Sequence, residues 1–157
     1  MRKIFIALTA ILLLISCMNN TNDNSWEKSM TGVFRTSCTD DPSIEPFTSD
    51  GTVSVHMDFN RYNTVQMILS GVKFSPMMPA INFALQNVTY TVGEDDDTWT
   101  FNAKNLVPYV GGVPREDYTL QQFKGQMTSN TMSLDFSIET HEKTYNVRFT
   151  HDKAEEE

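Results

Sequence analysis

The sequence predicts an all-β fold, an eight-stranded antiparallel up-and-down β-barrel. After residue 16 the chain contains seventeen Thr but only four Ala, together with many Val, Phe and Tyr, a composition typical of half-buried strands. Apolar and polar residues alternate strictly over many short segments, as they do in strands that bury one face. These segments follow one another through short turns, which favours neighbouring antiparallel strands over long crossover connections.

The first predicted strands lie in the N-terminal half of the body. Residues 30–37 form the first of them. In residues 52–59 the apolar side chains occupy every second position and the polar side chains occupy the other face. A turn at residues 60–63 follows, and the same apolar phase resumes in residues 65–69. The second and third strands therefore form a predicted hairpin.

The remaining strands follow the same pattern. Residues 81–92 shift their apolar phase at Asn87, which predicts one long strand with a β-bulge. The acidic run Glu94-Asp95-Asp96-Asp97 is the next turn. The last four predicted strands are residues 99–103, 118–127, 132–139 and 145–149. The last two form a second hairpin around a turn at residues 140–143.

Closure into a barrel is the simplest arrangement for eight such strands, because it removes the exposed edges of an open sheet. A flat sandwich is the competing arrangement. The barrel domain is expected to span residues 29–152, followed by an acidic tail at residues 153–157 that keeps the end of the chain soluble. An eight-stranded barrel is just wide enough to be filled by side chains or to hold one small ligand. The pattern does not decide between these two interiors.

Residues 1–16 have the features of a signal peptide. Arg2 and Lys3 form a short positive segment, and residues 4–15 form an apolar stretch interrupted only by Thr9. This stretch is too short for a transmembrane helix, which needs roughly 20 apolar residues. A polar segment begins abruptly after it. The pattern therefore predicts a leader that is removed.

The end of this leader, Leu14-Ile15-Ser16-Cys17, resembles the bacterial lipobox. The resemblance implies cleavage between Ser16 and Cys17, a diacylglyceryl thioether on the Cys17 sulfur and an acyl group on its amine. Two or three fatty chains make membrane attachment effectively permanent. The alternative is an ordinary secretory leader with a cysteine near its end by chance. We expect a lipoprotein signal peptide and a membrane anchor at Cys17.

Residues 17–28 are the expected lipidated cysteine and flexible tether. Loss of residues 1–16 removes two of the twelve cationic residues and none of the twenty acidic ones, which leaves a mature net charge of −10. Anionic headgroups repel such a body, so the barrel is expected to stand off the membrane. Met18 replaces the Asp that retains proteobacterial lipoproteins in the inner membrane. We therefore expect the outer membrane, at its periplasmic face or at the cell surface.

The middle of the chain resembles a known family. The run VQMILSGVKFSPMMPAINFALQNVTYTV at residues 65–92, the acidic turn after it and Trp99-Thr100-Phe101 resemble the calycin-like or lipocalin-like lipoproteins of gut Bacteroidetes. The resemblance covers about residues 30–151 and implies a lipocalin-like barrel. Gly32-Val33-Phe34 stands where true lipocalins carry Gly-x-Trp near the first strand. Their ligand-binding chemistry is therefore not carried over to any residue.

The sequence argues against several functional classes. A net charge of −8 without a basic run disfavours a nucleic-acid partner. No nucleophile elbow, P-loop or Cys-His arrangement is present, so we expect neither an enzyme nor a cofactor. The acidic turn lacks the alternating spacing of a calcium loop, and the three His residues lack paired metal-ligand spacing. We therefore expect no metal site.

Two connections are candidates for contact with a ligand or a partner. Met77 and Met78 lie in an apolar connection bounded by Pro residues, where adaptable Met side chains could line an entrance, grip a partner or cap the core. Val107, Tyr109 and Val110 lie in the longest irregular stretch, which contains Gly and Pro and could act as a lid or partner-contact loop. We take these five residues as the candidate site.

Cysteine use and the candidate site lead to two alternative functions. With Cys17 lipidated, Cys38 has no intramolecular disulfide partner, and we expect it to be buried or half-buried. The first function is an anchored envelope lipoprotein whose barrel binds or carries a small apolar molecule without catalysis. The alternative is a barrel with a filled core that acts as a protein-interaction or inhibitor module on another envelope protein. A filled interior would discriminate between the two.

Overall fold

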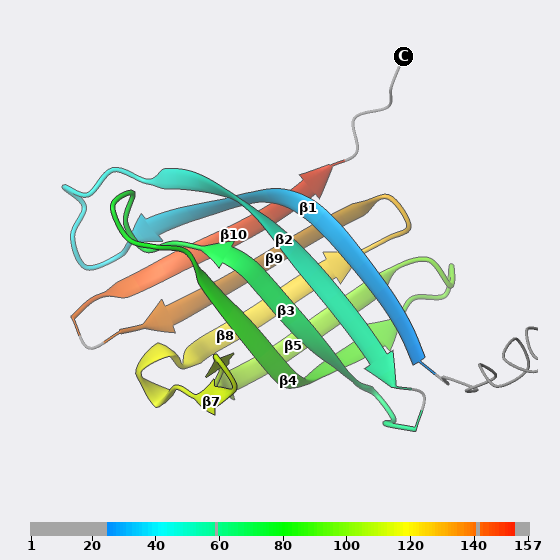
Figure 1. The fold of residues 1–157 in the computed structure, drawn as a ribbon. Coiled ribbons are helices and arrows are strands. Elements are labelled where there is room, and N and C mark those ends of the chain that lie inside the picture. Colours follow the sequence, from blue (N-terminus) through cyan, green and yellow to red (C-terminus); the bar gives the residue numbers. More distant parts are fainter. Residues whose placement is uncertain (1–24, 59, 141, 153–157) are drawn as a thin grey trace, which may run out of the picture.

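The computed structural model describes residues 25–58, 60–140 and 142–152. They form a closed, eight-stranded antiparallel barrel with up-and-down topology, which confirms the predicted fold class (Figure 1). Each barrel strand pairs with the barrel strands before and after it in the chain, and pairing of β1 with β10 closes the ring. The barrel strands are β1 Ser25–Cys38, β2 Phe47–Asp58, β3 Thr64–Val72, β4 Ile81–Val92, β5 Trp99–Leu106, β8 Leu120–Met127, β9 Thr131–Glu139 and β10 Thr144–Asp152.

The first strand begins earlier than predicted. β1 starts at Ser25, so it includes residues 25–28, which the sequence analysis placed in the flexible tether; that boundary is wrong. Trp26 pairs with Met57 of β2 in the antiparallel register. Side chains along β1 alternate between buried and exposed positions, and Lys28 occupies a half-buried one. Its amine donates hydrogen bonds to the carbonyls of Thr128 and Ser129. A Lys at such a position interrupts the apolar pattern, which is why the sequence did not reveal this part of the strand.

The predicted bulge in β4 is present. Between the pairs Val65–Val88 and Met67–Leu85, β3 advances by two residues while β4 advances by three. Asn87 carries a positive φ of 59°, a conformation that Asn tolerates better than most residues. The extra residue moves the apolar phase from Leu85 to Val88, so both side chains remain buried.

The connection between β5 and β8 is more regular than predicted. It contains a small hairpin, β6 Tyr109–Val110 and β7 Val113–Pro114, followed by a 3-10 turn, η1 Glu116–Tyr118. Tyr109 of β6 pairs with Ala84 of β4, so the hairpin extends the sheet beside the first half of that strand. The expectation of an irregular stretch is therefore wrong here.

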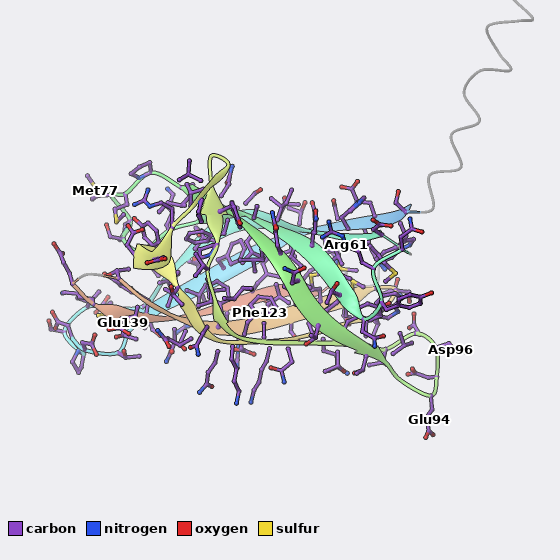
Figure 2. All side chains as sticks on the ribbon, turned by 90° about the horizontal axis from the view of Figure 1, so that it is seen from below. Arg61, Met77, Glu94, Asp96, Phe123 and Glu139 are labelled. Atoms are coloured by element: carbon purple, nitrogen blue, oxygen red, sulfur yellow. The ribbon has the colours of Figure 1, made fainter. Side chains whose placement is uncertain are left out.

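The two ends of the barrel differ in what they carry. One end, which we call the Ser25 end, holds the start of β1 and the β2–β3, β4–β5 and β8–β9 turns. The opposite end, which we call the Met77 end, holds the β1–β2, β3–β4, β5–β8 and β9–β10 connections. Figure 2 shows Met77 and Glu139 near one end and Arg61 and Asp96 near the other.

The interior is filled with the protein's own side chains. All eight barrel strands contribute buried apolar residues, and the Phe residues at positions 34, 83, 101, 123 and 149 are almost completely inaccessible. Thr36 is the one buried polar residue of the described chain, and its hydroxyl donates a hydrogen bond to the Lys73 carbonyl. Among the described residues no buried side-chain nitrogen or oxygen lacks a hydrogen-bond partner. Cys38 is buried, as predicted.

Aromatic rings pack at the Ser25 end of this core. The Trp99 ring stacks on the Trp26 ring with centroids 5.3 Å apart, and it also stacks on the Tyr90 ring with centroids 5.2 Å apart. The Tyr90 hydroxyl lies 3.8 Å from the Met57 sulfur. Offset stacking of this kind adds to the free energy gained from burial alone. These rings cover the core at this end of the barrel.

Candidate functional site

A pocket opens at the Met77 end of the barrel. Its volume is about 240 Å³, and it is open to solvent. Side chains from the β3–β4 connection, η1, the β9–β10 turn and β10 meet around it. The pocket is lined by Phe74, Met78, Asp117, Tyr118, Thr140, Glu142 and Tyr145.

The β3–β4 connection places the two candidate Met residues differently. The Met78 N–H donates to the Ser75 carbonyl, and the Met77 N–H donates to the Ser75 hydroxyl oxygen, so residues 75–78 form a turn. Met78 lies at the pocket and is 36% exposed, whereas Met77 projects into solvent and is 94% exposed (Figure 2). The structure thus places one predicted residue at the pocket and the other outside it.

Aromatic rings form the floor of the pocket. Phe74 is almost fully buried, and its ring lies 5.9 Å from the stacked Tyr118 ring and 5.1 Å from the tilted Tyr145 ring. Phe83, inside the barrel, lies 5.6 Å from Tyr118. The aromatic floor of the pocket is therefore continuous with the core, and its position is fixed by core packing.

An ion pair and a cation–π contact link residues within the segment that contains η1. The Arg115 guanidinium donates to both carboxylate oxygens of Asp117, at 2.7 Å and 2.5 Å. The guanidinium carbon of Arg115 lies 5.1 Å from the centre of the Tyr118 ring, which is within the range of a cation–π contact. The hydrogen bond to Asp117 is the main reason that the pKa of Arg115 lies above its ordinary value. Arg115 therefore covers one face of the Tyr118 ring.

Tyr145 supplies a neutral phenol to the pocket. Burial of the ring is the main reason that the pKa of Tyr145 lies above its usual value. The hydroxyl therefore remains protonated at neutral pH and can donate a hydrogen bond to a bound group. Ring faces and a thioether share the pocket with two phenols, the Thr140 hydroxyl and the carboxylates of Asp117 and Glu142, a mixture that suits an amphipathic side chain.

The predicted residues of the β5–β8 connection do not line this pocket. Val107, Tyr109 and Val110 are half-buried, and Val110 packs against the core. Tyr109 and Val110 form β6, which pairs with β4, and Val107 lies just before it, so these residues do not form an open lid. In the hairpin it is Val113 that is exposed, at 59%.

Sequence reasoning missed Tyr118 and Tyr145 as pocket residues. It placed both in strands on account of their alternation, and alternation alone does not show that two strands end at the same rim. The sequence signal that could have identified them is their position: each aromatic residue stands at the start of a predicted strand, and the structure places Tyr118 in η1, two residues before β8, and Tyr145 near the start of β10. Only the order of the strands around the barrel brings these termini together.

The other features that the sequence singled out have structural roles in the described residues. The acidic turn is organised by Asp95, which accepts hydrogen bonds from the N–H groups of Asp97 and Thr98 and from the Thr98 hydroxyl. The hydrogen bonds from Thr98 are the main reason that the pKa of Asp95 is lowered. A ring nitrogen of His151 bonds to the Thr31 carbonyl. No group of three potential metal ligands occurs among the described residues.

Cys17, the predicted lipid-attachment residue, and the acidic tail lie outside the described residues. Within residues 25–58, 60–140 and 142–152, no helix is long and apolar enough to cross a bilayer. Comparison with known proteins gives no match to any family model, any curated protein or any solved structure.

Proposed function

We propose that this chain is a lipid-anchored protein of the cell envelope whose barrel is a protein-interaction module. Its contact surface is the Met77 end, and its partner is another envelope protein. Cys17 is the anchor, and the outer membrane is the expected location. The proposal requires no catalysis, cofactor or metal.

One observation carries the proposal: exposed apolar side chains lie at the same end of the barrel as a small pocket with an aromatic floor. Met77, Met78 and Val113 are exposed at the same end as the pocket formed by Phe74 and its neighbours. Interaction surfaces combine such exposed apolar side chains with pockets that accept an anchor residue of the partner. At about 240 Å³ the pocket is smaller than most sites for drug-sized ligands but large enough for a partner side chain.

The filled interior supports this function over carriage of a small apolar molecule. A carrier needs an internal volume with a few polar groups that orient the ligand. Here the barrel strands direct buried apolar side chains into the interior, and the buried Thr36 hydroxyl is already bonded to the Lys73 carbonyl. A ligand inside the barrel would have to displace packed rings such as Phe34 and Phe83.

The position of the anchor fits the same function. The chain enters the barrel at Ser25, and the predicted lipid site at Cys17 precedes this end. The Met77 end lies at the other end of the strands. An anchor on one side of the barrel and a contact surface on the opposite side would leave that surface free to meet a partner.

Site-specific photocrosslinking in the host's own envelope tests the contact surface. A photoreactive residue is placed at Met77 or Val113 of the full-length chain, and at Tyr62 as the matched control. Tyr62 is 89% exposed but lies at the Ser25 end. We expect one discrete adduct of the same mass from positions 77 and 113 and none from position 62. Absence of an adduct at both positions, or an equal adduct at position 62, would contradict the proposal.

Native mass spectrometry tests the alternative carrier function directly. The protein is purified from its own host, and its mass is measured before and after organic extraction. We expect the lipidated chain without additional bound mass in both measurements. A reproducible extra mass that is lost on extraction would favour the carrier and would identify its ligand.

A further inference from the structure

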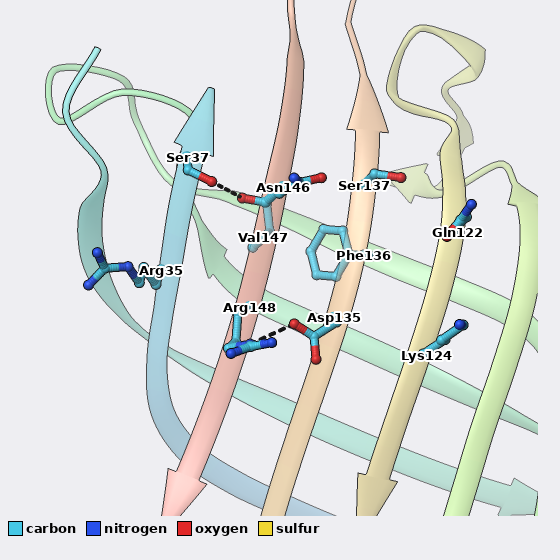
Figure 3. A pocket seen from close by; sticks show the side chains of 10 residues that line it. All are labelled: Arg35, Ser37, Gln122, Lys124, Asp135, Phe136, Ser137, Asn146, Val147 and Arg148. Atoms are coloured by element: carbon cyan, nitrogen blue, oxygen red, sulfur yellow. Dashed lines mark hydrogen bonds and ion pairs between the residues drawn. The ribbon is translucent and has the colours of Figure 1, made fainter. Parts of the chain in front are cut away.

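A row of charged side chains crosses the outer wall of the barrel, away from both ends. Arg35 of β1 pairs directly with Arg148 of β10, Arg148 pairs with Asp135 of β9, and Asp135 pairs with Lys124 of β8. Figure 3 shows these four side chains on four neighbouring strands, with Arg148 directed toward Asp135 and Arg35 directed away from the other three. Three cations and one carboxylate therefore form a continuous band.

A polar row runs beside this band and creates a groove. Ser37, Asn146, Ser137 and Gln122 are paired across the same four strands, one level closer to the Met77 end. The side chains between the two rows, Phe136 and Val147, point into the barrel and are buried. The groove has a volume of about 390 Å³, which lies in the range of small-molecule sites.

The charges in this groove are only partly balanced. Arg148 Nε donates to Asp135 Oδ1 at 2.6 Å, and this contact is the main reason that the pKa of Arg148 is raised. Neither Arg35 nor Lys124 forms an ion pair with any residue that the structure describes. The band thus carries a formal charge of +2 in a chain with twenty acidic and twelve basic residues.

The Arg35–Arg148 pair is unfavourable for the fold itself. Like charges directly opposite each other on neighbouring strands destabilise a sheet. Arg148 points toward Asp135 and Arg35 points the other way (Figure 3), so the two guanidinium groups offer two separate positions for anionic groups rather than one shared position. Guanidinium groups bind carboxylate and sulfate oxygens through paired hydrogen bonds. A departure from sheet-forming rules without a structural gain is expected at functional sites.

We propose that this groove binds a short anionic oligosaccharide that carries carboxylate or sulfate groups. Arg35, Arg148 and Lys124 would bind the anionic groups, and the adjacent hydroxyl and amide side chains would bind the sugar hydroxyls. The site is separate from the Met77 end and does not depend on the function proposed for it.

The composition of the groove favours an oligosaccharide over the other anionic partners. The outward-facing side chains of both rows are all polar, whereas protein interfaces centre on apolar and aromatic anchors. Binding of single-stranded nucleic acid relies on stacked aromatic rings, and no outward-facing ring is present in the groove. A long polyanion would also extend onto the acidic remainder of the protein, which would repel it, whereas a short one would leave most of that surface untouched.

Calorimetric titration of the purified full chain in neutral detergent tests the proposal. The probes are defined tetrasaccharides: a tetragalacturonate, a sulfated chondroitin tetrasaccharide and neutral cellotetraose. We expect at least one anionic probe to bind, with a Kd that rises with added NaCl, and we expect cellotetraose not to bind. Arg148→Gln should weaken binding by at least about tenfold, as loss of a charge-assisted hydrogen bond predicts.

Matched variants test whether the sugar binds in this groove. Arg61→Gln removes an exposed cation at the Ser25 end and should leave the Kd unchanged, and Met77→Asp should do the same. Asp135→Asn should tighten binding, because it releases Arg148 from its ion pair. The proposal is overturned if no anionic tetrasaccharide binds, if Arg61→Gln acts like Arg148→Gln, or if a tetraglutamate peptide binds as tightly as the sugars. None of these outcomes bears on crosslinking at Met77.

Discussion

Asp41 connects two loops at the Met77 end through its carboxylate. One oxygen accepts hydrogen bonds from the hydroxyl and the N–H of Ser43, and the other accepts a 3.1 Å hydrogen bond from the Lys143 amine. The bond from Ser43 and then the bond from Lys143 lower the pKa of Asp41 below its ordinary value. The same contact raises the pKa of Lys143. The β1–β2 loop is thereby joined to the β9–β10 turn beside the pocket.

These shifts predict a defined pH dependence of stability. Because the pKa of Asp41 is lowered in the folded state, its charged carboxylate stabilises the fold fully above about pH 4, the ordinary pKa of an Asp side chain. This stabilisation is lost as the pH falls through the lowered pKa. Because the pKa of Lys143 is raised, the stability that its charged amine adds to the fold is lost only as the pH rises through this raised pKa, above about pH 10. Asp41→Asn should therefore lower the Tm between these limits and have a smaller effect at pH 2.

Thermal unfolding of the wild type and the variant across this pH range is the measurement. Asp50→Asn serves as the control, because it removes an exposed carboxylate outside the Asp41–Lys143 ion pair. The expected result is a Tm difference for Asp41→Asn that shrinks in acid and a smaller, different profile for the control. A difference that stays constant from pH 7 to pH 2 would mean that the carboxylate charge has no part in stability.

At the scale of single residues, the sequence predicted burial better than it predicted neighbours. Cys38 is buried as expected, because an unpaired thiol at the end of an alternating strand behaves as a small apolar group. The exposure of Met77 excludes core capping, one of the alternatives left open for this residue. The Arg35–Arg148–Asp135 band was not identified, because these residues lie on three different strands. Pairing across strands depends on register, which no local pattern reveals.

At the scale of elements, the β6–β7 hairpin depends on two Gly residues. Gly111 and Gly112 form its two-residue turn with φ values of 60° and 83°, both in the left-handed region. Two-residue turns of this kind suit the twist of a hairpin and require positive φ at both positions. A Cβ at either position would meet no atom within 4 Å. The need for Gly here is therefore conformational rather than steric.

We predict that Gly112→Val opens this hairpin without unfolding the barrel. A β-branched residue in the left-handed region costs about 1–2 kcal/mol, and the short hairpin has few contacts with which to offset this cost. Hydrogen exchange should accelerate at the amides of Val113 and Arg115 and remain slow at Phe123 in β8. Gly112→Asn is the matched control and should exchange nearly as the wild type does, because Asn tolerates positive φ. Equal acceleration at Phe123 would show that the hairpin and barrel unfold as one unit.

Element prediction succeeded where the apolar period was strong. The hairpins of β2 with β3 and β9 with β10 follow from alternation and turn residues, and the phase shift at Asn87 located the bulge in β4. It failed where strands are very short, because β6 and β7 contain two residues each and cannot display a period. It also failed at the start of β1, where Lys28 interrupts the alternation.

At the scale of the whole molecule, closure and filling are linked. Antiparallel neighbours in chain order leave β1 and β10 as the two free edges, and pairing Phe34 with Phe149 removes both. The two rings then pack inside the barrel with centroids 4.8 Å apart. The sequence predicted that the barrel closes. Whether its interior is filled or hollow depends on the sizes of the aromatic rings together with the register of the strands. Large rings on facing strands fill the width that eight strands provide.

Under the proposed lipid anchor, the relation of the barrel to the membrane depends on Cys17. Seven residues lie between Cys17 and Ser25, so the start of β1 would lie at most about 28 Å of extended chain from a lipid on Cys17. The Met77 end would then be the end directed away from the proposed attachment point. If Cys17 carries the lipid, its removal should change location without changing the fold, because Cys17 precedes the first strand.

Cys17→Ala should abolish incorporation of a radioactive fatty acid and should move the protein from the membrane fraction to the soluble fraction. Its circular dichroism and Tm should match those of the wild-type barrel. Cys38→Ala is the matched control: it removes a thiol that is buried in the barrel and should leave both the labelling and the membrane fraction unchanged. Labelling that persists in Cys17→Ala would refute the anchor. Labelling that is lost while the protein stays on the membrane would instead assign membrane attachment to the barrel or to its partner.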